Sequence, residues 1–192
     1  KQTGVAGEFA VVQLEVWPGH RGSGFRFESN LGETVLPKEF LSAIEKSCAE
    51  SVESGTLAGF PVADVQVRLV GAECRDEEST ERSFVVAAAM AVSDGLRQAG
   101  PVILEPVMKV EVVTPEEYRG AIQGGLNSRR GQITGIEMRG NAQLVSADVA
   151  LAEMFGYVGA LRSMTQGRAS YTMQFSHYDE APSAVLNKIL GL

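Results

Sequence analysis

The sequence has few of the residues from which metal sites and disulfide frameworks are built. Its 192 residues include two cysteines and two histidines. Cys48 and Cys74 lie far apart without a CxxC pair, so we expect free or buried thiols rather than a disulfide framework or a zinc site. His20 and His177 have neither metal-ligand spacing nor a place in a Ser-His-Asp pattern. No catalytic residue is therefore predicted in this chain.

Long apolar runs, a signal-peptide pattern and a phosphate-binding loop are also absent from the sequence. No apolar stretch approaches the roughly 20 residues that span a bilayer, so we expect a cytoplasmic protein without membrane contact. Without a GxxxxGK[ST] motif the chain lacks the nucleotide cradle of a GTPase and is not expected to hydrolyse GTP. We expect no cofactor in this chain.

Basic charge is scarce as well. The 17 Lys and Arg residues are outnumbered by 24 Asp and Glu, which gives a net charge of −7. Most of the acidic excess is in residues 1–100, which hold 9 basic and 15 acidic side chains. This balance argues against a strong sequence-independent grip on nucleic-acid phosphates. One basic concentration stands out, for which a solvated face and an RNA contact are both open: Arg129, Arg130, Arg162 and Arg168.

What is present is an ordinary globular composition, 44% hydrophobic and 21% charged, with a length that suits one large or two small domains. The dipeptide Gly100-Pro101 predicts the boundary, because proline disfavours helix in the residue before it and cannot continue a hydrogen-bonded ladder. We therefore expect one domain over residues 1–101 and another over 102–192.

Hydrophobic periodicity in the first half predicts three strands and two helices. Apolar and polar residues alternate over 12–16, 25–27 and 65–69, which is the period of a half-buried strand. Four-residue spacing predicts the helices, the first of them between Pro37 and Gly55. Their apolar stripes are Phe40, Ile44, Cys48 and Val52, then Val85, Ala88, Val92 and Leu96. The predicted order is β-β-α-β-α, with both helices on one face of the sheet.

The second half has another pattern, with strands expected over 108–112, 132–138 and 142–149. Thr114-Pro115-Glu116-Glu117 has the spacing of a capping box and predicts a helix through about Asn127, with the glutamates serving the helix start rather than catalysis. A second helical stripe and a last core-facing strand complete the pattern: Leu151, Met154, Phe155, Val158 and Leu161, then Tyr171, Met173 and Phe175. The resulting order β-α-β-β-α-β is that of a ferredoxin-like domain, so the fold class is α+β.

Three separated stretches resemble the C-terminal part of bacterial elongation factor G in order and spacing: residues 104–116, 127–133 and 151–173. Residues 57–62 are also similar to that family. The resemblance covers essentially the whole chain and implies domain four, with the fold of the second domain of ribosomal protein S5, followed by the ferredoxin-like domain five. It further implies that the GTPase part, with its GTP and Mg²⁺, lies upstream of Lys1 in a longer parent protein.

The resemblance also implies a function and its site residues. Domain four of that family reaches the decoding region of the small ribosomal subunit, where it meets tRNA and mRNA, and domain five rests on large-subunit rRNA. By position, the tip residues would be Thr3, Gly4, Val5, Arg75, Asp76 and Ser79. The rRNA contacts would be the four arginines named above. We expect the chain by itself to be monomeric and non-catalytic.

The two tip loops depart from the family pattern. Gly4-Val5-Ala6-Gly7-Glu8 stands where the family has Gly-Gly-Arg-Gly-Gln, and Arg75 stands where translocases usually have histidine. Arg75 either contacts RNA or pairs with Asp76 or Glu77. Acidic side chains in these loops would repel phosphates: Glu8, Glu77, Glu78 and Glu81.

Two alternatives follow from these departures and from the fold. The parent could be an elongation factor G paralogue that acts in ribosome recycling, stress translation or ribosome protection. The ferredoxin-like half could instead be a regulatory module that binds a small ligand and dimerises through its sheet, since this fold serves many functions. The polar face with Thr172, Gln174 and Ser176 fits either use. Calorimetry with amino acids and nucleotides tests the regulatory hypothesis, because no heat on titration would discard it.

Overall fold

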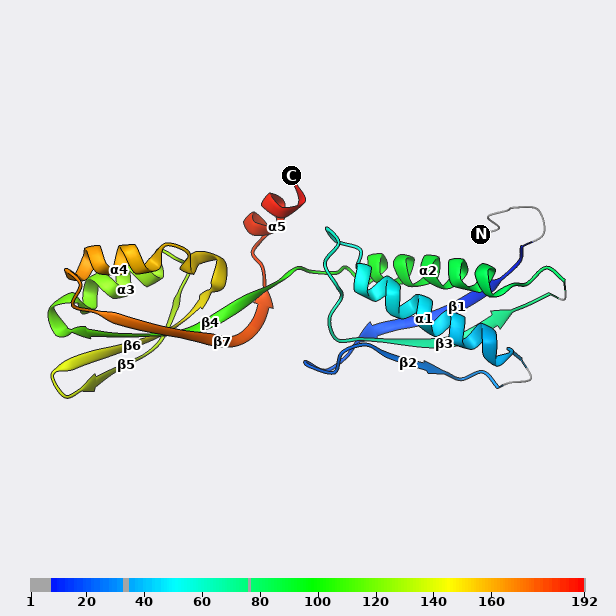
Figure 1. Cartoon of the computed structure of the whole chain (residues 1–192), viewed down its shortest axis with the longest axis horizontal. Helices are drawn as coiled ribbons and strands as arrows, with labels where there is room; N and C mark the ends of the chain where they lie inside the picture. Colours follow the sequence, from blue (N-terminus) through cyan, green and yellow to red (C-terminus); the bar gives the residue numbers. More distant parts are fainter. Residues whose placement is uncertain (1–7, 33–34, 76, 192) are drawn as a thin grey trace. The chain divides into compact units, whose positions relative to one another are not determined.

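The computed structural model describes residues 8–32, 35–75 and 77–191 and divides the chain into two compact units. Unit 1 ends at Pro101 and unit 2 begins at Val102; each is described by itself (Figure 1). Across the described ranges, none of the helices combines the length and the apolar character needed to cross a membrane.

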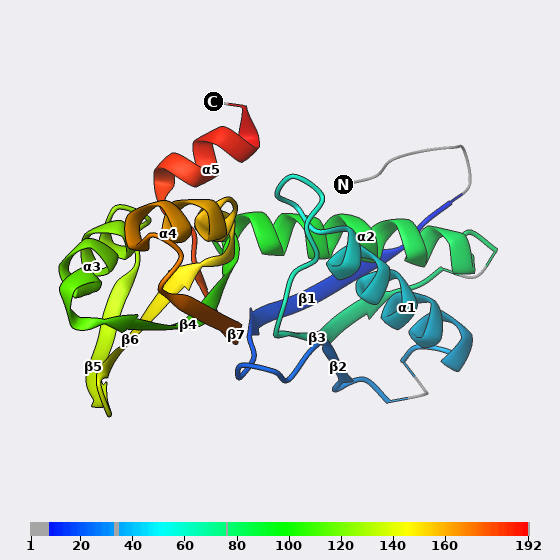
Figure 2. The same cartoon turned by 60° about the vertical axis from the view of Figure 1, so that its left-hand side comes forward.

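Unit 1 is a three-stranded sheet with two helices packed on one of its faces (Figures 1 and 2). Its elements are β1 (Val11–Pro18), β2 (Arg26–Ser29), α1 (Lys38–Ser54), β3 (Val65–Glu73) and α2 (Glu81–Gln98). The central strand β3 pairs antiparallel with β1 and parallel with β2. The predicted order β-β-α-β-α is confirmed.

The core of unit 1 forms where the helical stripes meet the inward face of β3. The fully buried side chains of α1 and α2 recur every four residues, as the period of an amphipathic helix requires. In α2, however, Phe84 and not Val85 begins the buried stripe: the Phe84 ring is 0% exposed and stacks on Phe40 with ring centroids 4.8 Å apart. Val85 is only partly buried, and its carbonyl accepts a 2.7 Å hydrogen bond from Ser47 Oγ. Burial of a ring such as Phe84 stabilises the fold by about 1.5–3 kcal/mol.

Unit 2 is an antiparallel four-stranded sheet in the order β5-β6-β4-β7. Its elements are β4 (Leu104–Pro115), η1 (Glu116–Tyr118), α3 (Arg119–Asn127), β5 (Gln132–Arg139), β6 (Ala142–Ala150), η2 (Leu151–Met154), α4 (Tyr157–Thr165), β7 (Ser170–Glu180) and α5 (Ser183–Leu190). The predicted ferredoxin-like order is confirmed, and α3 ends at Asn127 as expected. The short helix α5 was not predicted.

The capping box predicted at Thr114 is wrong. Thr114 and Pro115 still belong to β4, where they pair with Gln143 and Ala142 of β6, and the Thr114 side chain is 1% exposed. Continued strand pairing keeps the threonine hydroxyl away from the helix start, and the chain enters α3 through the 3-10 turn η1, which has no side-chain cap. The strand pairing of β4 with β6 therefore overrides the capping-box pattern in the sequence.

The single helical stripe predicted through Phe155 and Val158 is also wrong. Gly156 adopts φ 76°, a left-handed conformation that costs an L side chain about 1–2 kcal/mol, and it separates the 3-10 turn η2 from α4. The break shifts the buried stripe of α4 to Tyr157, Leu161 and Thr165. Phe155 and Val158 consequently face outward, with 78% and 47% of their surfaces exposed.

On β7, the prediction that Met173 and Phe175 are core residues is wrong as well. Met173 pairs with the buried Val110, so it stands on the core side of the sheet, yet it is 41% exposed and Phe175 is 54% exposed. β7 is an edge strand, and only Tyr171 and His177 along it are partly buried; the Tyr171 ring meets Tyr157 of α4 edge-on, with ring centroids 5.1 Å apart. Alternation gives the face of a residue but not whether anything covers it.

Candidate nucleic-acid interface

One candidate surface is the end of unit 1 where β1 begins and the loop from β3 to α2 turns (Figure 1). Of the predicted tip residues, Thr3, Gly4, Val5 and Asp76 lie outside the described residues. Arg75 and Ser79 are described, and both contact Phe9, the residue that leads from the first predicted loop into β1. The structure thus joins the second tip loop to the base of the first.

Hydrogen bonds fix this junction. The Arg75 backbone N–H donates to Ser79 Oγ at 2.8 Å, and the same hydroxyl donates to the Phe9 carbonyl at 2.7 Å. The Phe9 N–H in turn donates to the Glu78 carbonyl at 2.8 Å. Ser79 therefore links the backbones of two segments 70 residues apart in sequence.

The Arg75 side chain is engaged but not enclosed. Its guanidinium lies 3.8 Å from the centre of the Phe9 ring and 3.3 Å from Glu78 Oε2. The carboxylate that pairs with Arg75 is thus Glu78, whereas Asp76 or Glu77 was expected. The backbone of Glu77 adopts a left-handed conformation with φ 70°. Because 56% of the Arg75 side chain is exposed, part of the guanidinium can still meet an external group.

The start of α2 lies against the same junction. Thr80 accepts a hydrogen bond from the Ser83 N–H and the Thr80 N–H donates to Ser83 Oγ, a capping box in which serine replaces the usual glutamate. Ser83 Oγ also lies 3.3 Å from the Phe9 carbonyl. Sequence reasoning missed Phe9 and Ser83, although the Thr-x-x-Ser spacing before an apolar stripe was a recognisable sign of the helix start.

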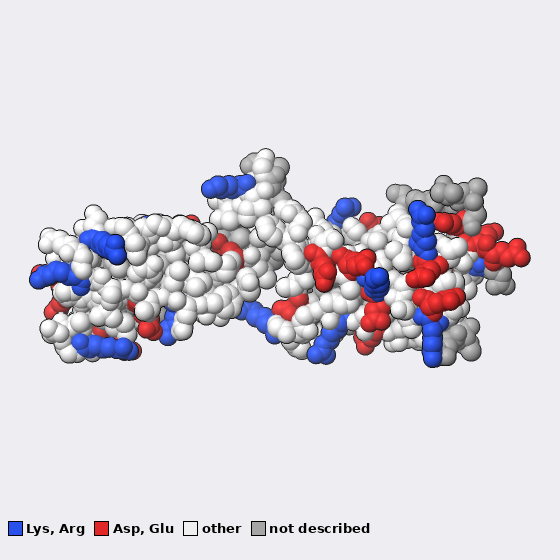
Figure 3. Space-filling view, in the orientation of Figure 1, with Lys and Arg blue, Asp and Glu red and all other residues white. Residues whose placement is uncertain are grey.

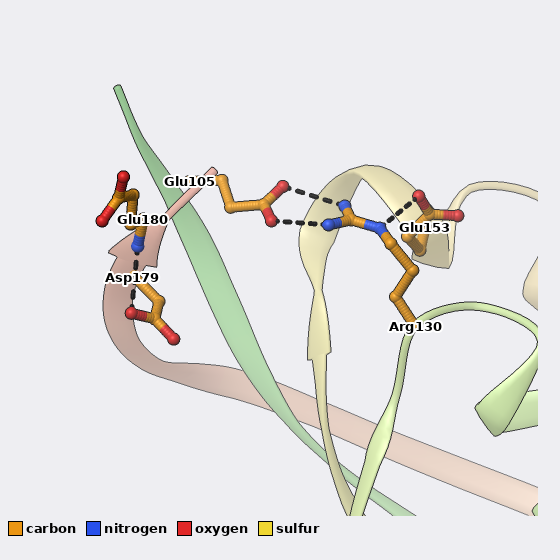
Figure 4. A network of polar contacts seen from close by, with 5 residues as sticks. All are labelled: Glu105, Arg130, Glu153, Asp179 and Glu180. Atoms are coloured by element: carbon orange, nitrogen blue, oxygen red, sulfur yellow. Dashed lines mark hydrogen bonds and ion pairs between the residues drawn. The ribbon is translucent and has the colours of Figure 1, made fainter. Parts of the chain in front are cut away.

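In unit 2, the predicted arginines are mostly used within the protein, as Figure 4 shows for Arg130. Its guanidinium donates two parallel hydrogen bonds to Glu105 Oε1 and Oε2, at 2.9 and 3.0 Å, and a third to Glu153 Oε1 at 3.0 Å. The paired carboxylates raise the pKa of Arg130, with the bonds to Glu105 as the main cause. The Glu105 side chain is only 14% exposed.

Arg129 holds the neighbouring turn. Its guanidinium donates to the backbone carbonyls of Glu153 and Phe155, and it lies 5.3 Å from the centre of the Tyr157 ring. Tyr157 is fully buried and has no hydrogen-bond partner for its hydroxyl within the described part of the chain. Burial raises the pKa of Tyr157 to about 12, so the phenol stays neutral.

Arg168 and Arg162 lie apart from this pair. Arg168 bonds Glu117, and its guanidinium lies 6.0 Å from the centre of the Tyr118 ring. The hydrogen bond to Tyr118, more than the charge of Glu117, raises the pKa of Arg168. Arg162 is exposed on α4, and its guanidinium has no partner among the residues that the structure describes. Of the four arginines, Arg129, Arg130 and Arg168 are therefore bonded to groups of the protein, and within the described part of the chain Arg162 is free to contact a partner.

Charge is distributed differently on the two units. On the face shown in Figure 3, acidic and basic side chains are interspersed over unit 1, whereas unit 2 has a broad uncharged area and Lys or Arg side chains toward one end. Within the described ranges, no three His, Cys, Asp or Glu side chains gather into a group that could hold a metal ion. Both cysteines are free thiols; Cys48 is buried and Cys74 is exposed.

Comparison with known proteins gives matches along the whole chain. Residues 1–100 match the family model described as "Elongation factor G, domain IV", and residues 102–189 match "Elongation factor G C-terminus". The chain is 50% identical over 189 residues to elongation factor G of Dinoroseobacter shibae and 48% identical over 191 residues to that of Aquifex pyrophilus. These alignments cover 98% and 100% of this chain but 27% of each relative.

A solved structure shows the same similarity in three dimensions. A crystal structure of a Thermus thermophilus protein superimposes with a TM-score of 0.80 at 35% identity, covering 99% of this chain and 28% of that one. The chain thus spans between a quarter and a third of the length of each of these three proteins.

Proposed function

The chain belongs to the elongation factor G family, and from this we propose that it is the ribosome-engaging C-terminal part of a translocase. In this proposal the longer parent protein is a cytoplasmic GTPase that uses GTP and Mg²⁺, and the present residues contribute no catalytic group. Unit 1 enters the small-subunit decoding region beside tRNA and mRNA, and unit 2 rests on large-subunit rRNA. The observation that carries the proposal is near-50% identity to two elongation factor G proteins over almost the entire chain.

The geometry of unit 1 supports a steric role for its tip. The Ser79 hydroxyl accepts from the Arg75 N–H and donates to the Phe9 carbonyl, so it fixes the second tip loop to the residue at the base of the first. A part that blocks backward movement of a tRNA needs such rigidity, because a compliant loop would yield instead of resisting. Arg75 adds an exposed guanidinium over the Phe9 ring, a group that can contact phosphate or stack on a base.

Arg75→Ala and Ser79→Ala in the full-length protein test this role of the tip. Toeprinting of ribosome movement along mRNA should show slower translocation for both variants, with ribosome binding in sedimentation retained. Arg97→Ala, which removes an exposed arginine from the last turn of α2, is the matched control. Unchanged translocation by Arg75→Ala removes that residue from the site, and a full-length protein that neither carries a GTPase part nor sediments with ribosomes refutes the proposal.

A specialised paralogue is the second candidate, favoured by the acidity of the tip. Glu77 lies in the loop between β3 and α2, Glu81 follows that loop and Glu8 precedes Phe9, while Arg75 already pairs with Glu78. Such a loop gains less from RNA phosphates than a basic one would. Parallel assays of translocation and of ribosome recycling on the same preparation distinguish the two functions, since a recycling factor splits ribosomes without advancing them.

A further inference from the structure

We propose that Arg129 and Arg130 do not contact RNA themselves but position Phe155, whose exposed ring stacks on an unpaired RNA base. This inference rests on the proposed function, because it names the RNA-contacting group of unit 2 and the side chains that hold it in place. It reverses the expectation for the two arginines that the family resemblance implies, in which they contact rRNA.

Arg130 is committed to the protein by its own geometry. Bidentate bonding to Glu105 uses one edge of the guanidinium, and its Nε–H is bonded to Glu153. These bonds use three of the five N–H donors of the guanidinium, and the two carboxylates would repel a phosphate that approached the other donors. Breaking the bonds would leave Glu105, only 14% exposed, without its cation. What Arg130 does accomplish is to join β4 to η2, the turn that leads to Phe155.

Arg129 fixes the backbone on both sides of Met154. Its guanidinium donates to the carbonyls of Glu153 and Phe155, while the Met154 side chain between them is 5% exposed. The adjacent Tyr157 ring, fully buried, lies under the same guanidinium. Met154 and Tyr157 are therefore buried on either side, whereas Phe155 between them is exposed.

Phe155 is the most exposed large apolar side chain in the described part of the chain, at 78%. Such exposure contributes nothing to the stability of the fold, yet five hydrogen bonds from two arginines hold the turn that presents it. On the following helix, Val158 is 47% exposed, and Arg162, one turn later, has an unpartnered guanidinium within the described residues. An exposed aromatic ring followed seven residues later by a free cation suits a nucleobase and its phosphate.

Ribosome binding by the full-length protein, measured by sedimentation over a range of salt concentrations, tests the inference. Phe155→Ala should weaken binding roughly tenfold without changing the salt slope, and Phe155→Leu should do the same because an aliphatic side chain does not stack. Phe155→Tyr should retain binding. Arg162→Gln should lower the salt slope by about one phosphate contact, ~0.7–0.9.

The effect of Glu105→Gln on ribosome binding distinguishes the two roles of Arg130, because the two roles predict changes of opposite sign. If Arg130 is a positioning residue, loss of its carboxylate partner loosens the turn and weakens binding several-fold, as Arg130→Gln does. If Arg130 instead binds phosphate, Glu105→Gln releases it and strengthens binding. Glu137→Gln, which removes an exposed carboxylate from β5, controls for the change in net charge. Should Arg130→Gln not fold, as judged by circular dichroism, Glu105→Gln still decides between the roles.

Three results would overturn the inference while leaving the proposed function intact. They are stronger binding by Glu105→Gln, a reduced salt slope for Arg130→Gln, and full binding by Phe155→Leu, which would indicate an apolar protein partner. The double variant Phe155→Ala/Arg130→Gln should bind no more weakly than Phe155→Ala alone, because the arginine acts through the ring. A wild-type protein that does not bind ribosomes refutes the proposed function instead.

Discussion

Gly55→Ala should be among the most destabilising single-methyl changes in unit 1. Gly55 ends α1 with φ 62° and ψ 176°, a backbone conformation that L residues avoid. A Cβ there would lie 1.8 Å from the Phe60 carbonyl oxygen and 2.8 Å from its carbon. The Phe60 segment cannot move freely, because its N–H donates to Leu57 at 3.0 Å and the Val62 N–H donates to Val52 at 2.9 Å.

The magnitude follows from two contributions. Backbone strain in this region costs about 1–3 kcal/mol. Moving the turn away from the new methyl group breaks one or two backbone hydrogen bonds, at about 1 kcal/mol each. The sum is roughly 2–5 kcal/mol, a large part of the 5–15 kcal/mol that stabilises a typical domain. Gly59→Ala is the matched control, since Gly59 has φ 75° but no atom within 4 Å of its Cβ position, so only strain of about 1–2 kcal/mol remains.

Urea unfolding followed by tryptophan fluorescence measures the difference. Trp17 is the only tryptophan and belongs to β1, so its emission reports on unit 1. With a slope of about 1–3 kcal/mol per molar urea, Gly55→Ala should lower the midpoint by more than about 1 M and clearly further than Gly59→Ala. Both substitutions restrict the unfolded chain equally, so that effect cancels in the comparison. Equal midpoints for the two variants would refute the clash argument.

Three further predictions concern single side chains. Because burial, with a smaller effect of the Glu45 charge, raises the pKa of Cys48 to about 12, a thiol reagent at pH 8 should modify Cys74 and reach Cys48 only on unfolding. Hydrogen bonds from the Gly22 and Gly24 N–H groups lower the pKa of Asp64 and so stabilise the folded state when the carboxylate is ionised. This stabilisation is present above the unfolded pKa of about 4 and is lost as pH falls through the folded pKa. The stability of Asp64→Asn, measured by acid unfolding, should therefore lack this pH-dependent contribution. Tyr157→Phe should leave the thermal midpoint unchanged or raise it, by up to ~1 kcal/mol in stability, because the buried hydroxyl has no partner in the described chain.

The order of elements in both halves could be predicted because periodicity of two and of nearly four is a local property of the sequence. Two errors arose where a distant segment decides the outcome: pairing with β6 keeps Thr114 in a strand, and the edge position of β7 leaves Phe175 uncovered. The third has a local cause, because Gly156 adopts a left-handed conformation that rotates the stripe of α4. The spacing of apolar residues does not reveal such a break.

The same limit applies to the candidate sites. Residue type and resemblance select Arg130, but its carboxylate partners lie 25 and 23 residues away in the sequence, and their proximity exists only once β4 and η2 are in place. Likewise, Phe9 became part of the tip only through Ser79, 70 residues later. The sequence indicates which side chains could contact RNA, whereas the contacts formed on folding decide which of them remain free to do so.

The Phe9 carbonyl has a mechanical consequence. It receives the Ser79 hydroxyl immediately before the capped start of α2, an uninterrupted helix of 18 residues and thus about 27 Å long. A force applied where β1 begins is therefore transmitted to helix α2 and not taken up by bending of the loop. The helix carries this force to Gln98, three residues before the end of unit 1.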